Sequence, residues 1–320
     1  MNQPLAVGID IGGTNTVFGI VDRRGNILHQ GSIKTRDHQD IPLYMDALYQ
    51  GLSPLLDKVS GGGNQIKGIG IGAPNGNFYH GTIEFAPNLP WKGVIPLANL
   101  VTEQFGLPVE VTNDANAAAI GEMTYGAAKG IRDFIMITLG TGLGSGIVIN
   151  GQLVYGHDGF AGELGHVIVE KEGRLCGCGR YGCLETYVSA TGIVRTMLEL
   201  LGKRKTDSSL RGLKTEDITS KLICDAALEG DQLAQKAVDM TACTLGKALA
   251  NYIAFSAPEA IFLFGGLARA GDLLINPTRK YMNENVLQIW KDKVKLINSE
   301  LRESDAAILG ASALVWEMKE

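Results

Sequence analysis

The segment LAVGIDIGGTNTVFGIVD, residues 5–22, decides the fold expected for this chain. An apolar run ends at Asp10, a Gly-Gly-Thr turn follows at residues 12–14, and a second apolar run begins at Thr16. Two apolar runs of strand length joined by a short glycine turn predict a pair of neighbouring strands. Because the glycines lead into a strand and not into a helix, the turn does not fit a dinucleotide-binding fingerprint.

The same design returns twice further along the chain. Residues 134–149 read FIMITLGTGLGSGIVI, which is a strand, a Gly/Thr turn and a second strand. Residues 260–266 read AIFLFGG, a strand closed by two glycines. The chain uses 42 glycines in 320 residues, well above the usual share of ~7%, and they gather at the ends of apolar runs. The repeat predicts two related α/β lobes that share a cleft.

Helices are expected where apolar residues recur at helical spacing. These segments are residues 41–59, 98–106, 115–128, 188–202, 231–256 and 305–320. The expected division is a smaller α/β lobe from residues 1–120, rejoined by residues 305–320, and a larger lobe from residues 121–304. The helix at 115–128 is placed where it can serve as a hinge.

Composition excludes several classes of function. The net charge is −5 and no basic stripe stands out, so no nucleic-acid partner is expected. The locally basic stretch 202–214 is interpreted as a solvated loop. No apolar run reaches ~18 residues, so no membrane span is predicted. The N-terminal segment lacks the basic region of a signal peptide, which favours a cytoplasmic protein with reduced thiols.

The three glycine turns share one chemistry. Backbone N–H groups in such turns can approach phosphate oxygens closely, and Thr hydroxyls add donors. A single turn of this kind is weak evidence, since glycine turns between strands are common. The P-loop pattern GxxxxGK[ST] is absent, as are G-x-S-x-G and H-E-x-x-H. The remaining interpretation is one phosphate-binding hairpin in each lobe.

This combination resembles the actin-like ATPase (ribonuclease H-like) superfamily of two-lobed sugar kinases. The resemblance implies that Asp10 helps place Mg2+, which suits a hard cation that prefers carboxylate, water and phosphate oxygens. An ordinary turn or capping role is the alternative for Asp10. The resemblance also implies an ATP site formed by Gly12, Gly13, Thr14, Thr138, Gly140, Thr141, Gly142, Gly265 and Gly266.

One acidic residue stands between the two predicted lobes. Asp114, in the segment NDAN at 113–116, follows the strand-like run PVEVT and opens a helix rich in small residues. An Asp at this position is usually a helix N-cap. Phosphoryl transfer to a sugar hydroxyl, however, needs a base at the hydroxyl proton. Asp114 is therefore the candidate general base, with Asn113 beside it as a sugar ligand.

Three of the five cysteines crowd into CGCGRYGCLE, residues 176–185, downstream of ELGH at 163–166. His166, Cys176, Cys178 and Cys183 supply the four ligands of a closed tetrahedral zinc site. The intervening glycines allow the sharp turns that aim three sulfurs at one point. Four ligands leave no open position, so a structural Zn2+ is predicted and a catalytic one is not. Cys224 and Cys243 fall in helical patterns and are interpreted as core thiols.

The pattern E-x-G-H followed by C-x-C-G-x-x-G-C-x-E resembles the signature of the ROK family of repressors, open reading frames and kinases. D-I-G-G-T, N-D-A-N-A, L-G-T-G-L-G-S-G and F-G-G follow in that family's order over essentially the whole chain. The resemblance implies an ATP-dependent hexose kinase, with glucose as the leading substrate, that assembles as a homodimer or homotetramer through helices of the larger lobe. Sugar contacts are implied for Asn88, Asn113, Asp114, Glu163, His166 and Glu185, and for the loop that begins at Gly72.

The chain departs from the family pattern at a few positions. Asn15 stands where a Lys or Arg often follows D-I-G-G-T, which leaves one positive charge fewer near the phosphates. The loop GAPNG at 72–76 and the segment NLPWKG at 88–93 also differ from the usual G-A-P-G and N-L-P-G-W. These differences leave the sugar open among glucose, N-acetylmannosamine, N-acetylglucosamine, allose and fructose, and they leave polyphosphate open as a donor.

Two other classes of function compete with a kinase. Family repressors carry an N-terminal helix-turn-helix domain, and here the first strand begins by residue 5, so a repressor is not expected. A sugar sensor with an inactive kinase site is the other alternative. The presence of Asp10, Asp114 and all three glycine turns argues against it.

Overall fold

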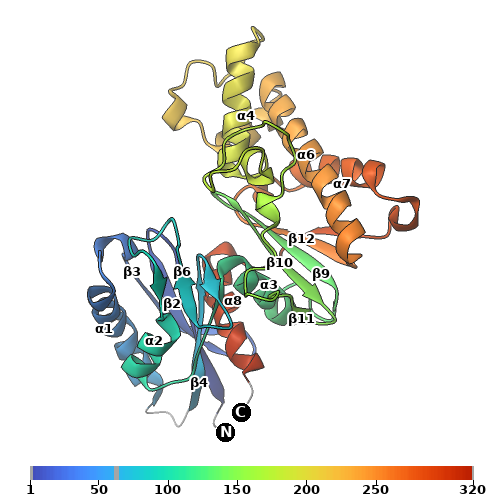
Figure 1. Ribbon diagram of the computed structural model, residues 1–320. Coiled ribbons are helices and arrows are strands. Elements are labelled where there is room, and N and C mark those ends of the chain that lie inside the picture. The colour runs from blue at the N-terminus through green and yellow to red at the C-terminus, as the bar shows by residue number, and fades with distance from the viewer. Residues whose placement is uncertain (1–2, 61–64, 319–320) are drawn as a thin grey trace. The chain divides into compact units, whose positions relative to one another are not determined.

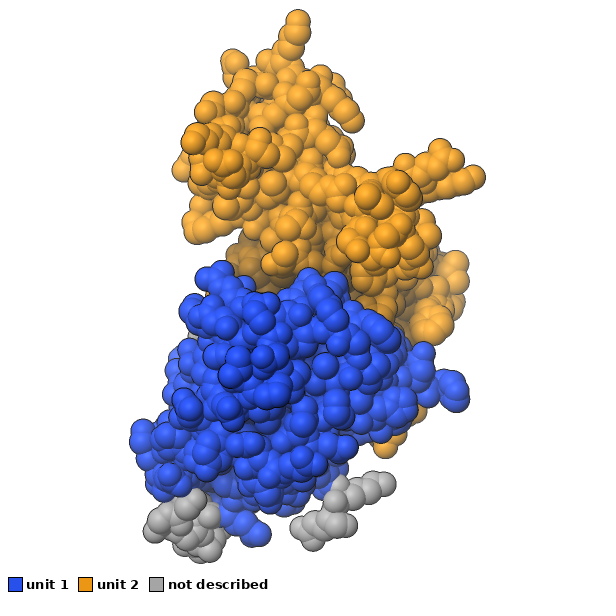
Figure 2. Space-filling model, turned by 60° about the vertical axis from the view of Figure 1, so that its left-hand side comes forward, with its two compact units in different colours: residues 1–130, 153–161, 300–320 blue, residues 131–152, 162–299 orange. Residues whose placement is uncertain are grey.

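The computed structural model describes residues 3–60 and 65–318, which form two compact units (Figure 1). Unit 1 comprises residues 1–130, 153–161 and 300–320, and unit 2 comprises residues 131–152 and 162–299 (Figure 2). The sequence placed the divisions at residues 120 and 305 and did not assign 153–161 to the first lobe. Parts of the expected smaller lobe, residues 1–2, 61–64 and 319–320, lie outside the described residues. Within the described ranges no helix is long and apolar enough to cross a membrane.

Unit 1 is built on a five-stranded sheet in the order β3-β2-β1-β4-β8. β1 (Pro4–Ile11) pairs antiparallel with β2 (Thr16–Asp22), which pairs antiparallel with β3 (Ile27–Ile33). On its other side β1 pairs in parallel with β4 (Gln65–Ala73), and β4 with β8 (Val109–Asn113). A small sheet follows β4, formed by β5 (Gly76–Asn77), β6 (Thr82–Glu84) and β7 (Val94–Ile95).

Helices cover both faces of this sheet because its central strands are apolar on both sides. α1 (Ile41–Ser60) and α2 (Leu97–Phe105) join the core that contains Leu5, Val7 and Ile9 of β1. α3 (Asp114–Tyr125) and α8 (Glu303–Glu317) contact each other, and α8 also contacts β1 and β4. Side chains alternate along a strand, so Gly8 lies on the α8 face. A Cβ at Gly8 would lie 2.0 Å from the Ile308 carbonyl oxygen, so α8 rests directly on the sheet.

Unit 2 repeats the same topology, with strand order β11-β10-β9-β12-β13. β9 (Phe134–Leu139) pairs antiparallel with β10 (Leu143–Ile149) and parallel with β12 (Ala260–Phe264), which pairs in parallel with β13 (Lys295–Asn298). β11 is Gln152–Leu153. The central antiparallel pair flanked by parallel strands therefore occurs in both units, which confirms the α/β fold and the internal repeat expected from the sequence.

The helices of unit 2 pack around one long buried helix. α6 (Gln232–Ser256) contacts α4 (Ala190–Lys203), α5 (Ser220–Leu228) and α7 (Asp272–Asn285). The sequence predicted α4 and α6 and a helical pattern around Cys224 of α5, but it gave no bounds for α5 and assigned no helix to α7 and no strand to β13. α7 is polar over most of its length and contains Pro277, which hides its helical spacing. Cys224 on α5 is buried and Cys243 on α6 is half-buried, as expected for core thiols.

Candidate active site and metal centre

The predicted general base and three predicted binding residues of unit 1 lie at the carboxyl ends of three neighbouring parallel strands. The register pairs Asp10 of β1 with Gly72 of β4, and Ala73 of β4 with Asn113 of β8. Asp114 follows as the first residue of α3. In open α/β sheets this edge is where ligands bind. The sheet register therefore brings together residues from three distant parts of the sequence, namely Asp10, Gly72 and the pair Asn113 and Asp114.

Gly72 keeps the space between the two carboxylates clear. A Cβ at this position would lie 3.5 Å from Asp10 Oδ1, 3.7 Å from Asp114 Cα and 3.2 Å from the Ala117 Cβ. Any larger side chain would fill the space next to both acids. The glycine at this position thus leaves room beside Asp10 and Asp114, and its φ does not lie in the left-handed region.

Both carboxyl groups have raised pKa values. Burial, and then the nearby charge of Asp114, raise the pKa of Asp10 to about 7. Loss of hydration at the carboxyl group also raises the pKa of Asp114, and the hydrogen bond from the Ala115 N–H opposes this shift. The residue as a whole remains exposed to solvent. Two acids held close together with raised proton affinity are typical of a site that binds a cation or moves a proton.

The cap of α3 is made by the neighbouring amide. Asn113 is the N-cap residue, and its Oδ1 accepts the Ala115 N–H at 2.8 Å. Asp114 Oδ1 accepts the same N–H at 2.7 Å. Because the Asn113 side chain supplies the cap, Asp114 is not needed for that role. The Asn113 amide nitrogen can donate to a hydroxyl.

The first glycine turn packs against the segment that carries Asn88. The Gly12 N–H donates to the Asn15 carbonyl at 2.9 Å and closes the turn. A Cβ at Gly13 would lie 2.5 Å from the Asn88 carbonyl oxygen, so only glycine permits this approach. Thr14 is exposed beside it. Lys34 Nζ donates to Asn15 Oδ1 at 2.8 Å, so a cation does lie at this turn although residue 15 is not basic.

The second glycine turn, which follows β9, is supported by the start of α4. The Ala190 N–H donates to the Gly140 carbonyl at 2.9 Å, and Thr191 Oγ1 donates to the Thr141 carbonyl at 2.9 Å. The Leu143 N–H donates to Glu185 Oε2 at 3.0 Å. A Cβ at Gly142 would lie 2.2 Å from the same oxygen. The turn is therefore held from one side by residues 185–191.

The third turn lies against the end of β9. Gly265 has φ +99°, a conformation that favours glycine, and its added Cβ would lie 2.8 Å from the Leu139 carbonyl oxygen. The Leu267 N–H donates to that oxygen at 3.1 Å. Phe264 pairs with Thr138 in the sheet. The turns after β9 and β12 are thus neighbours, and Gly266 is exposed beside them.

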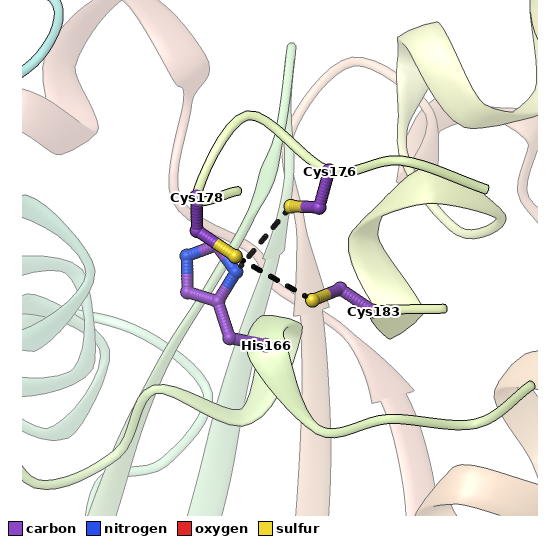
Figure 3. A group of neighbouring side chains, drawn as sticks. All are labelled: His166, Cys176, Cys178 and Cys183. Atoms are coloured by element: carbon purple, nitrogen blue, oxygen red, sulfur yellow. Dashed lines mark hydrogen bonds between the residues drawn. The ribbon is translucent and has the colours of Figure 1, made fainter. Parts of the chain in front are cut away.

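His166, Cys176, Cys178 and Cys183 converge on one point (Figure 3). Their candidate ligand atoms all lie within 4.8 Å of one another. Cys176 Sγ is 3.7 Å from His166 Nδ1, and Cys178 Sγ is 3.7 Å from Cys183 Sγ. A tetrahedral zinc ion with Zn–S of ~2.3 Å and Zn–N of ~2.0–2.1 Å requires edges of about 3.5–3.8 Å. The residues fit zinc, and the sulfur separation excludes a disulfide between Cys178 and Cys183.

Glycines shape the loop that carries the thiols. Gly179 and Gly182 have φ values of +85° and +79°. A Cβ at Gly182 would lie 1.8 Å from the Glu170 carbonyl oxygen. Arg174 fastens the loop to α4: its guanidinium bonds Glu199 Oε1 at 2.8 Å and the Thr186 carbonyl at 2.7 Å. These long-range contacts could not be predicted from spacing.

Two glutamates lie beside the candidate metal ligands. Glu163 Oε2 is 4.0 Å from His166 Nε2, on the ring nitrogen opposite the one that faces Cys176. Glu185 Oε1 is 3.4 Å from Cys176 Sγ. Glu185 thus contacts both the metal centre and the second glycine turn.

Sequence reasoning missed Lys34, Arg174 and Thr191. The position of Thr191 in the first turn of α4 could have been predicted from the segment VSATG. Ser189 of this segment is the N-cap of α4, and its Oγ accepts the Gly192 N–H at 2.9 Å. A Ser followed by a helical pattern is a standard helix start.

Comparison with known proteins places the chain in a family. The model of the ROK family matches residues 6–318. The chain belongs to the ROK family. It is 36% identical over 315 residues to a glucokinase of Thermotoga maritima, covering 97% of each protein. It is 30% identical to a xylose repressor of Caldicellulosiruptor bescii, covering 97% of this chain and 77% of the repressor.

The fold agrees with a solved ROK structure. A ROK family glucokinase from Streptomyces griseus, in complex with glucose and AMPPNP, superposes with a TM-score of 0.81 at 35% identity. The match covers 98% of this chain and all of the other. The two-lobed sugar-kinase fold implied by the sequence motifs is therefore confirmed.

Proposed function

We propose that this ROK family chain is an ATP-dependent glucokinase that transfers the γ-phosphate of ATP to the 6-hydroxyl of glucose. The observation that carries the proposal is the pair Asp10 and Asp114, at the ends of β1 and β8 on either side of β4, in a chain that is similar over its full length to glucokinases. A base beside a cation-binding acid is the minimal set for phosphoryl transfer to an alcohol.

Asp114 is the proposed general base. Its ionised carboxylate accepts the proton of the 6-hydroxyl, so that the oxygen can attack the γ-phosphorus and ADP leaves. A raised pKa makes the carboxylate a stronger proton acceptor than an ordinary Asp. The sugar is proposed to be held by hydrogen bonds from Asn88, Asn113, Asp114, Glu163, His166 and Glu185, in a pocket that Gly72 keeps open.

Asp10 is proposed to position Mg2+, which when bound neutralises phosphate charge. The half-buried carboxylate at the end of β1 fits a hard cation, and a bound cation would favour its ionised form. The triphosphate is proposed to lie against the backbone of Gly12, Gly13 and Thr14 in unit 1 and of Thr138, Gly140, Thr141 and Gly142 in unit 2. Gly265 and Gly266 are proposed to contact the nucleoside.

His166, Cys176, Cys178 and Cys183 are proposed to hold a structural Zn2+. The fit of their separations to a tetrahedron supports this assignment. Bound there, the ion cross-links residues 166–183 and fixes Glu163 and Glu185 on either side. Assembly as a homodimer or homotetramer is part of the proposal, and light scattering of the purified chain tests it.

The test is turnover with Mg-ATP across glucose, allose, fructose and the two N-acetylhexosamines. Glucose is expected to be the best substrate, and Asp114→Ala should lower kcat by about 10²–10⁴-fold, the usual worth of a general base. Asp57→Ala, which removes an exposed carboxylate of the same unit, is the matched control and should keep the full rate. Full activity of Asp114→Ala would remove it from this role, and preference for another sugar would correct the substrate.

A further inference from the structure

The segment from Cys183 to Thr191 runs from the metal centre to the second glycine turn. At its start, the Cys183 carbonyl accepts the Thr186 N–H at 3.0 Å and Thr186 Oγ1 at 2.8 Å. The Leu184 N–H donates to the Val167 carbonyl at 2.9 Å, next to His166. Leu184 and Thr186 are buried. The segment therefore begins at one proposed zinc ligand, Cys183, and is hydrogen-bonded to the chain neighbour of another, His166.

The far end of the same segment holds the turn. Ala190 donates its N–H to the Gly140 carbonyl and Thr191 its hydroxyl to the Thr141 carbonyl, both at 2.9 Å. Glu185 accepts the Leu143 N–H at 3.0 Å. Three successive contacts thus bind the backbone of residues 140–143 to residues 185–191.

The middle of the segment is rigid enough to connect the two ends. Ser189 Oγ donates to the Glu185 carbonyl at 2.8 Å and accepts the Gly192 N–H at 2.9 Å, which locks the helix cap onto the turn that precedes it. The Val188 N–H donates to the Leu184 carbonyl at 2.9 Å. Hydrogen bonds therefore connect Leu184 and Glu185 to the first turn of α4.

The turn itself has an open position. Among the described residues, and apart from its chain neighbours, no heavy atom lies within 4 Å of a Cβ built on Gly140, so the turn is open at this position. Backbone donors bind an anion best when they are oriented in advance, because a turn that must be ordered on binding loses affinity. The hydrogen bonds that Ala190 and Thr191 donate to the Gly140 and Thr141 carbonyls orient the peptide groups of this turn.

We infer that residues 183–191 couple the metal centre to nucleotide binding, and that Thr191 is a positioning residue for the ATP phosphates. The inference rests on the proposed function, since it takes the turn at 138–142 as part of the ATP site. Thr191 acts through the Thr141 carbonyl and has no direct part in the reaction. The bound metal orders Cys183, and the segment transmits that order to the turn.

The first test is Thr191→Val, which removes the hydroxyl and keeps the shape. The Kd for Mg-ATP, measured by calorimetry without sugar, should rise about 2–12-fold, the worth of one hydrogen bond. KM for ATP should rise with it while KM for glucose stays unchanged. Thr191→Ser should restore wild-type values. Thr244→Val removes a similar helix hydroxyl, bonded to the Met240 carbonyl at 3.0 Å, and should change nothing.

The second test removes zinc from the wild type with a chelator. Amide exchange of residues 139–145 should accelerate, and the Kd for ATP should rise. By reciprocity, ATP should strengthen zinc binding by the same factor. The inference would be overturned if zinc removal left amide exchange of the wild type unchanged and Thr191→Val left the Kd for ATP unchanged. That outcome would leave the kinase assignment intact. A wild type that does not bind ATP but still shows faster exchange without zinc would instead overturn the assignment of the turn as an ATP site.

Discussion

Asp10→Asn is expected to stabilise the folded chain at about pH 8 while abolishing phosphoryl transfer from Mg-ATP. Asp10 lies at the end of β1, where burial and the neighbouring Asp114 raise its pKa to about 7. Ionisation of this carboxyl group is therefore unfavourable in the folded chain. An asparagine of nearly the same shape removes the charge and its cost, and it also removes the proposed cation ligand.

The size of the effect follows from proton linkage. Between the ordinary value of 3.8 and the folded value of about 7, the folded chain keeps a proton that the unfolded chain has released. The unfolded state then binds fewer protons, so the stability of the wild type falls as pH rises. From about pH 5 to about pH 8, these two pKa values give a loss of about 2.5 kcal/mol. Asp10→Asn has no ionisable group at this position, so its free energy of unfolding does not include this loss.

The assay is urea unfolding of both proteins at the two pH values, without Mg2+ or ATP. Asp22→Asn is a control of opposite sign. Burial alone would raise the pKa of Asp22, but hydrogen bonds from Asn26 and Arg24 lower it, so removing that carboxylate should destabilise the chain at about pH 8. The reasoning is refuted if the stability difference between wild type and Asp10→Asn is the same at both pH values.

The remaining predictions concern the metal centre and the contact between α8 and the sheet. Elemental analysis should find about one zinc per wild-type chain and almost none in Cys183→Ser, while Cys224→Ser keeps its zinc; equal zinc in both variants would contradict the ligand set. Gly70→Ala should lower stability by about 3 kcal/mol or more, because its Cβ would lie 1.9 Å from the Ala311 carbonyl oxygen. Gly202→Ala on α4 places its Cβ where no atom lies within 4 Å, so this variant should gain about 0.5–1 kcal/mol of folding stability. Thermal unfolding measures both variants, and an equal loss of stability in the two would contradict this explanation.

Features encoded by short spacing were predictable from the sequence. The four candidate zinc ligands fall within 18 residues, from His166 to Cys183, and the glycines between them mark the turns that bring them together. The glycine turns were found because each follows an apolar strand. The repeat of one topology in both units was visible for the same reason, since strand, turn and strand recur in order.

Features that depend on distant partners were not predictable. Segment 153–161 belongs to unit 1 because the Asn77 side chain donates to the Asp158 carbonyl at 2.8 Å and the Tyr79 hydroxyl to the Gly156 carbonyl at 2.9 Å. No local pattern indicates such contacts. The cation beside Asn15 was missed for the same reason, because Lys34 reaches it from the end of β3. The choice of Asn113 over Asp114 as helix cap is a difference of one residue, which is within the usual uncertainty of helix ends.

The contact of α8 with Gly8 and Gly70 has a consequence for biosynthesis. β1 and β4 leave the ribosome early, but the helix that covers this face of their sheet is made almost 300 residues after β1. At ~5–20 residues per second this delay is on the order of 15–60 s. During that time the part of the sheet face that α8 covers has no cover from its own chain, and a nascent chain that stalls before residue 303 never gains that cover. Unit 1 should therefore mature after translation of α8, and incomplete chains should be targets for chaperones and proteases.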